Sequence, residues 1–256
     1  MPLRIAFDLD GVLADMEAEL VRQAEVLFGE PMTRKLQARA AEADQSGDDG
    51  PADQAATTPP ASPADGAGAA GPPPLERLSM TGRQERRLWH HVETIENFWE
   101  TLEELEPGLI GRLSVLATDR RWEIIFLTKR PETVGATAQV QTQHWLESRG
   151  FALPSVYVVQ GSRGRIAAAL ALDIVIDDRP ESCLDVVVDS SARAILVWRD
   201  DEKHLPAAAR RLGIGVVKSV DECLDILTQL DTPGAAQPGV MDRVKRMFGL
   251  KEPTSA

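Results

Sequence analysis

The chain has 256 residues, of which 40 are acidic and 28 basic, and its formal net charge at pH 7 is -12. This length allows one substantial core with a small accessory module, and the acidic balance disfavours binding of a nucleic acid polymer across an open surface. Two cysteines are too few for a disulfide framework, the start does not resemble a secretion signal, and no apolar run approaches the ~20 residues that span a bilayer. We therefore expect a cytoplasmic protein without an integral membrane segment.

The N-terminal part of the chain predicts a strand, a helix and a long loop. Residues 3–7 are apolar and run into an acidic cluster, which is typical of a buried strand that ends in a polar loop. Residues 16–28 carry apolar side chains at helical spacing. From about residue 41 to 75 the composition is reduced to Ala, Gly, Pro, Asp, Ser and Thr, so this stretch is expected to be disordered. Such a length is unusual inside a folded domain, which favours a loop within an insertion.

The rest of the chain alternates between strand and helix patterns. Helical spacing predicts helices over residues 84–105, 109–118, 133–149, 164–172, 180–188 and 220–230, and apolar runs predict strands over 122–127, 155–159, 174–176, 194–197 and 216–217. Alternation with nearly continuous apolar strands predicts a parallel sheet with helices on both faces.

Residues 231–256 predict a linker and an amphipathic C-terminal helix. Prolines interrupt the start of this tail, and apolar side chains then alternate with basic ones. The helix either docks on its own domain or frays in solvent, or it binds a partner or an anionic membrane surface.

Polar residues directly follow three of the predicted strands. Asp8 and Asp10 follow the first strand, Thr128 follows the strand at 122–127, and Asp177 and Asp178 follow the strand at 174–176. Ligands in open α/β sheets bind outside the carboxyl ends of the strands, so these residues should meet at one rim. Each group alone is compatible with a solvated turn or a helix cap. Their joint occurrence favours a functional site.

The segment Asp8-Leu9-Asp10-Gly11 suits phosphoryl transfer. One carboxylate can attack phosphorus, while the other donates a proton to the leaving oxygen and later activates water. Gly11 permits a tight turn. Carboxylates at this spacing repel one another and a phosphate dianion, so a hard divalent cation with oxygen ligands is needed, and Asp177 or Asp178 would supply a further ligand.

These segments resemble the motifs of the haloacid dehalogenase-like superfamily. Residues 7–15 are similar to its first motif, Leu127-Thr128 to its second and residues 176–181 to its fourth. The resemblance implies an α/β Rossmannoid parallel sheet with helices on both faces. Residues 1–15 and 108–230 would form the catalytic core, and residues 16–107 a small helical cap inserted after the first strand.

The resemblance also implies roles for the motif residues. Asp8 would be the nucleophile and a Mg²⁺ ligand, and Asp10 would be the general acid/base that offers its backbone carbonyl to the metal. Thr128 would bind phosphate, and Asp178 would hold Mg²⁺ with Asp177 beside it. Because dehalogenases of the superfamily lack the acid/base, its presence favours a phosphatase.

The third motif of the family is a lysine, and here the sequence departs from the pattern. Arg163 occupies the matching position and Arg165 is close by, although both could be solvated charges at a helix start. Lys129, directly after Thr128, is another candidate for the cation that binds phosphate. Arginine is a planar fork and not a compact point charge, so this departure concerns the turnover rate more than the reaction class.

Residues 97–108 are similar to the stretch before the second motif in 5'(3')-deoxyribonucleotidases. This resemblance implies a small phosphorylated metabolite as substrate, for example a nucleoside monophosphate. Phe98 and Trp99 would either stack on the leaving group, a contact worth ~1–3 kcal/mol for bases, or anchor the core.

Two classes of function remain open from the sequence. The first is a Mg²⁺-dependent phosphomonoester hydrolase with an aspartyl-phosphate intermediate, or the same chemistry with an acceptor other than water. The second is a catalytically weak binding or scaffold protein on the same fold, which would use the long loop and the C-terminal helix.

Overall fold

The computed structural model describes residues 2–45 and 77–230. The chain divides into two compact units, Met1–Met16 with Ile95–Ala256 and Glu17–Thr94. The first unit thus includes residues 95–107, which the sequence analysis assigned to the inserted cap. Within the described ranges, no helix combines the length and the apolar character needed to cross a membrane. The predicted C-terminal helix and residues 46–75 of the predicted loop lie outside these ranges.

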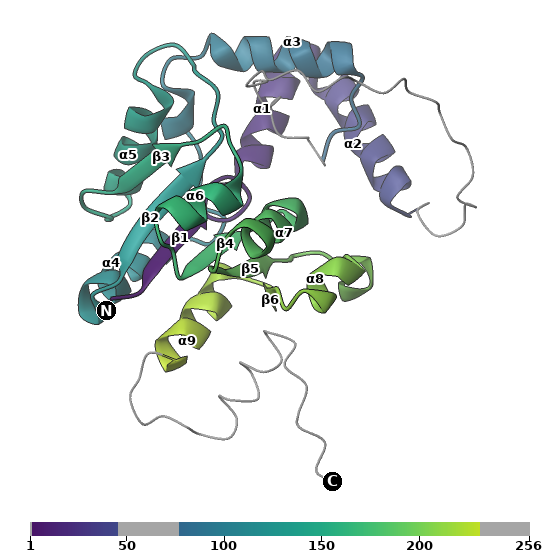
Figure 1. Cartoon of the computed structure of the whole chain (residues 1–256). Helices are drawn as coiled ribbons and strands as arrows, with labels where there is room; N and C mark the ends of the chain where they lie inside the picture. Colours follow the sequence, from purple (N-terminus) through teal and green to yellow (C-terminus); the bar gives the residue numbers. More distant parts are fainter. Residues whose placement is uncertain (1, 46–76, 231–256) are drawn as a thin grey trace, which may run out of the picture. The chain divides into compact units, whose positions relative to one another are not determined.

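The first unit contains a six-stranded parallel sheet (Figure 1). Its strands have the order β3-β2-β1-β4-β5-β6, so the chain runs outward from β1 first to one side and then to the other. This is the doubly wound order of Rossmann-type folds, and the predicted α/β fold class is confirmed. The strands are β1 (Arg4–Asp8), β2 (Glu123–Thr128), β3 (Ser155–Val158), β4 (Ile174–Asp177), β5 (Arg193–Val197) and β6 (Gly215–Val217).

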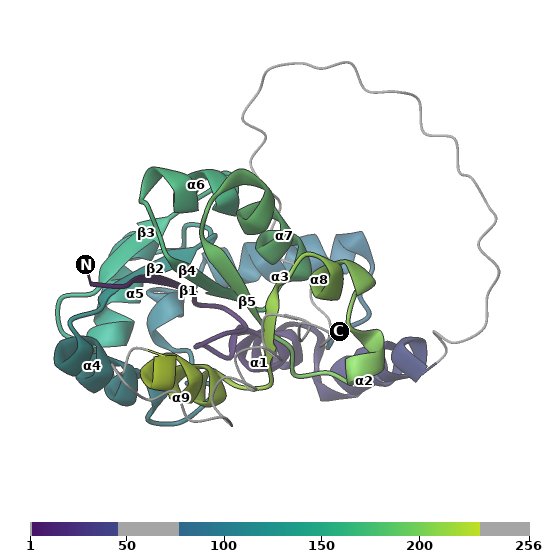
Figure 2. The same cartoon turned by 60° about the horizontal axis from the view of Figure 1, so that its bottom comes forward.

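Helices cover both faces of the sheet. Figure 2 shows α6 (Arg163–Ala169) and α7 (Pro180–Asp189) on one face and α4 (Leu109–Arg120) and α9 (Val220–Leu230) on the other. Two further helices, α5 (Ala138–Ser148) and α8 (Ala207–Arg211), follow β2 and β5. Helices on both faces remove the sheet from water, which requires apolar side chains on both sides of the central strands.

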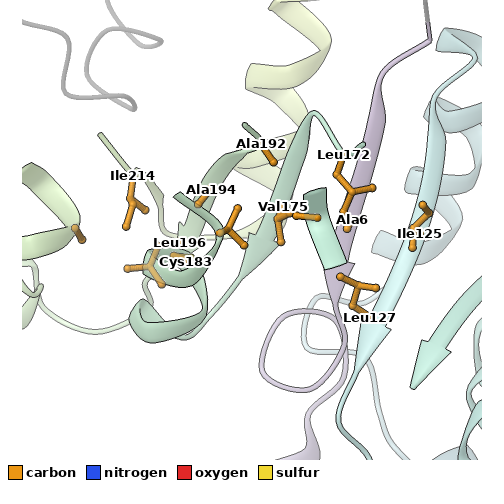
Figure 3. Packing of buried hydrophobic residues seen from close by; sticks show 13 residues of the cluster. Ala6, Ile125, Leu127, Leu172, Val175, Cys183, Ala192, Ala194, Leu196 and Ile214 are labelled. Carbon is orange, nitrogen blue, oxygen red and sulfur yellow. The ribbon is translucent and has the colours of Figure 1, made fainter. Parts of the chain in front are cut away.

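The core under α6, α7 and α8 is formed by alternate strand residues and small helix residues (Figure 3). On β1, Ala6 belongs to this cluster, while its neighbours Ile5 and Phe7 are also fully buried. Successive strand residues point to opposite faces, so both faces of β1 are packed. The cluster consists of Ala6, Ile125, Leu127, Ala167, Leu172, Val175, Cys183, Val186, Ala192, Ala194, Leu196, Ala209 and Ile214.

The second unit is helical. Its helices are α1 (Met16–Phe28), α2 (Glu30–Gln45) and α3 (Gly82–Glu93). A capping box begins α3: the Thr81 hydroxyl accepts from the Gln84 backbone N–H, and the Gln84 side chain accepts from the Thr81 N–H. The helix α2 was not predicted and includes residues 41–45, which were expected to be disordered. Its sequence is rich in alanine and long charged side chains, which favour a helix.

Two predicted helix boundaries are wrong by five residues or more. The helix expected over residues 84–105 ends at Glu93, and after it Asn97 has a left-handed backbone (φ 52°) and leads into the short 3-10 helix η1 (Phe98–Glu100). The helix expected from residue 133 begins at Ala138, where the Thr137 hydroxyl caps it by accepting from the Val140 N–H. In both cases the apolar spacing in the sequence extends beyond the helix, and the local backbone or cap sets the helix boundary.

Candidate active site

Three neighbouring strands bring the candidate residues to one rim of the sheet. In the parallel register, Asp8 at the end of β1 lies opposite Leu127 of β2, so Thr128 comes one residue beyond it. On the other side Phe7 lies opposite Ile176 of β4, which is followed by Asp177. All three polar groups therefore stand at carboxyl ends of adjacent strands, where the strand order also reverses. Doubly wound sheets bind their ligands at such a place.

Arg163 contacts the carboxylate of Asp8. Arg163 Nη2 donates to Asp8 Oδ1, and both side chains are buried. Arg163 Nε lies 3.6 Å from Asp177 Oδ2. Among the described residues, Arg163 Nε and Nη1 and Asp177 Oδ2 have no hydrogen-bond partner. Buried donors and acceptors rarely stay unpaired in native proteins, so these atoms suit a polar ligand.

The structure separates the three candidate cations. Arg163 is at Asp8, whereas the side chain of Arg165 is 85% exposed and lies 4.0 Å from Asp189 Oδ2. Lys129 is half-buried at the end of β2. Of these three side chains, Arg163 on α6 is the one that contacts Asp8.

Close packing of α6 on α7 places Arg163 at the rim. The Ser162 hydroxyl donates to Asp185 Oδ2 at 2.7 Å, and the Gly164 backbone N–H donates to the same oxygen at 3.1 Å. A Cβ on Gly164 would collide with the backbone carbonyl of Asp185. Glycine therefore lets α6 approach α7 closely, one residue after the arginine.

Gly11 has a corresponding role beside the acidic pair. Its φ is +85°, and a Cβ there would collide with Asp178 Oδ2. Only glycine allows the loop after Asp8 to turn in this conformation and approach Asp178 this closely. Asp177 Oδ1 accepts from the Arg179 backbone N–H at 2.9 Å, while Asp178 Oδ1 is buried without a partner among the described residues.

Burial and mutual repulsion disfavour the ionised forms of these carboxyls. Burial raises the pKa of Asp8 well above its ordinary value; Arg163 opposes this shift, and the other acidic side chains of the rim add to it. Burial also raises the pKa of Asp177, against the effect of Arg163. Burial and the charge of Asp177 raise the pKa of Asp178 to about 7.

Asp10 is held by Thr128 and by Arg130, a residue that the sequence analysis missed. Thr128 Oγ1 donates to Asp10 Oδ2 at 3.2 Å. Arg130 Nε lies 3.1 and 3.0 Å from the two Asp10 carboxylate oxygens, and Arg130 Nη2 donates to Asp10 Oδ1 at 2.7 Å. The only sequence signal was a basic residue directly after Thr128-Lys129.

Phe98 and Trp99 are both fully buried in this structure, which gives no support for the stacking alternative from the sequence analysis. Their rings pack edge to face with centroids 4.9 Å apart, and Trp99 Nε1 donates to the Pro131 carbonyl at 3.0 Å. In this arrangement neither ring offers surface on which a leaving group could stack. The alternative from the sequence, anchoring of the core, describes both residues.

The carboxylates fit a hard divalent cation. Within residues 2–45 and 77–230, no group of three or more His, Cys, Asp or Glu side chains is arranged to hold a metal ion. Mg²⁺ needs fewer, because it takes one or two carboxylates with carbonyl and water oxygens. The unpartnered buried oxygens of Asp177 and Asp178 could accept a cation, and the raised pKa values show that their ionised forms lack sufficient compensating charge without one.

Comparisons with known proteins give matches among solved structures only; no family model and no curated protein matches the chain. The structure is similar to a protein assigned as a β-phosphoglucomutase from Thermotoga maritima (14% identity, 89% of this chain and 99% of that chain, TM-score 0.49). It is also similar to a HAD family hydrolase from Deinococcus radiodurans R1 solved with phosphate and sodium (15% identity, 90% of this chain and 96% of that chain, TM-score 0.47). A third similar structure is a haloacid dehalogenase-like hydrolase from Streptococcus pneumoniae (12% identity, 88% of this chain and 98% of that chain, TM-score 0.46). These likenesses are distant, and the fold of this chain rests on its own strand order.

Proposed function

We propose that the chain is a Mg²⁺-dependent hydrolase of small phosphomonoesters that forms an aspartyl-phosphate on Asp8. The observation that carries this proposal is the pairing at the rim. Arg163 binds one oxygen of the buried Asp8 carboxylate, and a second carboxylate, Asp10, is held two residues further on. A nucleophile, a cation and an acid/base group are the parts that transfer of a phosphoryl group to a carboxylate requires.

In the first step, a carboxylate oxygen of Asp8 attacks phosphorus and the bond from phosphorus to the leaving oxygen breaks. Asp10 donates a proton to that oxygen, so an alcohol leaves and Asp8 carries the phosphoryl group. The unpartnered Nε and Nη1 of Arg163 can donate to phosphoryl oxygens. Thr128 and Lys129 are further candidates for phosphate contact, because they follow β2 at the same rim.

In the second step, water attacks phosphorus, Asp10 takes its proton, and the bond between Asp8 and phosphorus breaks to release inorganic phosphate. Asp8 and Asp178 with their carboxylates and Asp10 with its backbone carbonyl would hold Mg²⁺. Bound Mg²⁺ supplies positive charge that offsets these carboxylates and polarises phosphoryl oxygens.

Recognition of the leaving group has no support from the aromatic residues named in the sequence analysis. Because Phe98 and Trp99 are buried, they give no support for base recognition. Nucleoside monophosphates therefore stand beside sugar phosphates as candidate substrates.

The experiment that tests this proposal is a phosphate-release assay. A panel of nucleoside monophosphates and sugar phosphates is incubated with Mg²⁺ or with chelator, and the native chain is compared with Asp8→Asn. We expect metal-dependent release that falls by a factor of about 10³ or more in the variant, as for loss of a nucleophile elsewhere. Asp119→Asn, at an exposed carboxylate on α4, is the matched control and should retain turnover. Absence of release from every substrate would contradict the proposal.

A further inference from the structure

One edge of the Arg130 guanidinium binds the carboxylate of Asp10 through two nitrogens. Nε and Nη2 of Arg130 both donate to this carboxylate, over distances of 2.7 to 3.1 Å. Two parallel donors on one carboxylate fix its plane as well as its position. Thr128 Oγ1 donates a further hydrogen bond to Asp10 Oδ2 at 3.2 Å, so the carboxylate has little freedom to rotate.

Arg130 is itself held on its remaining side. Its Nη1 donates to Thr142 Oγ1 at 2.9 Å, and the Thr142 hydroxyl donates in turn to the Ala138 carbonyl at 2.7 Å within α5. The guanidinium carbon lies 4.8 Å from the ring centroid of Trp99 and 5.8 Å from that of Trp145. A cation over aromatic faces is stabilised by the ring quadrupoles. The side chain of Arg130 is fully buried.

Contact with Asp10 accounts for two features of the structure: the burial of Arg130 and the packing of two tryptophans around it. A buried arginine is rare unless it is paired, and here its pair is a residue of the candidate site. The two tryptophans pack around that arginine, and their own N–H groups are bound to the carbonyls of Pro131 and Leu102. Each side-chain nitrogen of Arg130 and both indole N–H groups thus have a hydrogen-bond partner.

We propose that Arg130 is a positioning residue that sets the orientation of Asp10 for proton transfer; this inference rests on the proposed function. Arg130 does not touch the phosphoryl group in this role and acts only through the Asp10 carboxylate. Loss of Arg130 then lowers kcat and leaves KM almost unchanged, because substrate binding does not depend on it.

The test is a double-mutant cycle on the full chain with saturating Mg²⁺ and p-nitrophenyl phosphate as the probe. We expect Arg130→Met to lower kcat by about 10- to 100-fold, since a misplacement near 1 Å can cost ~10²-fold, with KM within about threefold. In the Asp10→Asn background, the same change should lower kcat by less than about threefold, because coupled residues are non-additive. Arg130→Lys keeps the charge but not the double contact, and should recover part of the lost kcat.

The matched control is Arg149→Met. Arg149 also lies over the Trp145 ring, at 4.4 Å, but its hydrogen bonds go to the backbone of Leu102 and Trp145 and to Ser148. Its effect should be equal in the native and Asp10→Asn backgrounds. Equal losses for Arg130→Met in both backgrounds would overturn the positioning role while the proposed function stands. A native chain without turnover would overturn the proposed function and this role together.

A second measurement does not require turnover. In ¹⁵N–¹H spectra of the arginine Nε groups, assigned with Arg130→Lys and Arg149→Lys, the Asp10→Asn change should move the Arg130 signal and leave the Arg149 signal in place. An unmoved Arg130 signal would overturn the contact and with it the inference, even where the doubly substituted chain is too slow to assay.

Discussion

The two halves of the rim differ in how their polar atoms are satisfied. Around Asp8, burial leaves oxygens of Asp177 and Asp178 and two donors of Arg163 without hydrogen-bond partners among the described residues. Around Asp10, both carboxylate oxygens receive hydrogen bonds, and the arginine that donates them is bound on its remaining side and packed against tryptophans.

This difference indicates what each half of the rim contributes to the proposed reaction. Unpaired buried polar groups are costly, so the Asp8 half should change most when phosphate or a cation binds. A fully bonded network is already organised before the reaction and needs no rearrangement. The Asp8 half would accept the ligand, and the Asp10 half would present a fixed proton-transfer group. The predictions below test this contrast, from the largest expected effect to the smallest.

Replacing Arg163 with Met should have the largest effect. The variant removes the cation at Asp8 and the two donors offered to phosphate, so kcat/KM should fall by about 10²- to 10³-fold, the usual loss for one transition-state donor. Arg165→Met is the matched control on the same helix, because its side chain is exposed. It should stay within about twofold of the native chain in the same phosphate-release assay. Equal losses in both variants would mean that charge on α6, and not contact with Asp8, matters.

The stability of the protein should depend on pH and Mg²⁺ through the Asp8 half. The pKa of Asp178 is raised to about 7, so the folded state binds its proton more tightly than the unfolded chain does. The resulting stabilisation is present at low pH and is lost as pH rises through about 7. In chelator, the free energy of unfolding should therefore fall between pH 4 and pH 8, by a few kcal/mol from Asp178 alone, and the raised pKa values of Asp8 and Asp177 act in the same direction.

Urea unfolding at a series of pH values measures this loss. Mg²⁺ binds the ionised carboxylates, so it should restore stability at pH 8 more than at pH 5. Asp178→Asn removes one of these titrating groups and should reduce the pH dependence, while Asp8 and Asp177, whose pKa values are also raised, keep the remainder. A native chain whose stability in chelator rises over this range would show that these carboxyls are not proton-bound in the folded state.

Gly164→Ala should destabilise the protein by about 3 kcal/mol, near the upper end for overpacking, because the obstacle is the backbone of α7. The displaced helix should also move Arg163 and lower kcat/KM. Gly161→Ala, where the added methyl group meets open space, is the control and should change the free energy of unfolding by less than about 0.5 kcal/mol. Similar unfolding midpoints for the two variants would argue against close packing of α6 on α7.

The sheet and the rim could be predicted from sequence because both depend on local pattern. Apolar strands buried on both faces are continuous hydrophobic runs, and Asp8, Thr128 and Asp177 each follow such a run directly. Parallel strands then bring their carboxyl ends to one edge without further information. The sequence offered Arg163, Arg165 and Lys129 as candidate cations, and the contact with Asp8 and the exposure of Arg165 become apparent only in the structure.

Arg130 could not be predicted in the same way, since an arginine after a strand is usually exposed and is rarely buried unless it is paired. Its burial depends on Trp99 and Trp145, which come from segments distant in sequence. The two alternatives for Trp99 could not be separated from sequence for the same reason. An aromatic residue before the second motif suggested a stacking platform, while its partners, Phe98 and the Pro131 carbonyl, become apparent only in three dimensions.

Trp99→Phe gives the smallest expected effect and separates packing from substrate contact. The change keeps an aromatic ring over Arg130 but removes Nε1, which leaves the Pro131 carbonyl without this donor. Loss of one hydrogen bond should lower the free energy of unfolding by about 1 kcal/mol, measured by urea unfolding. KM for every active phosphomonoester should be unchanged, because the ring has no exposed surface. A rise in KM confined to nucleoside monophosphates would instead show that Trp99 reaches the base, and that the ring becomes exposed when substrate binds.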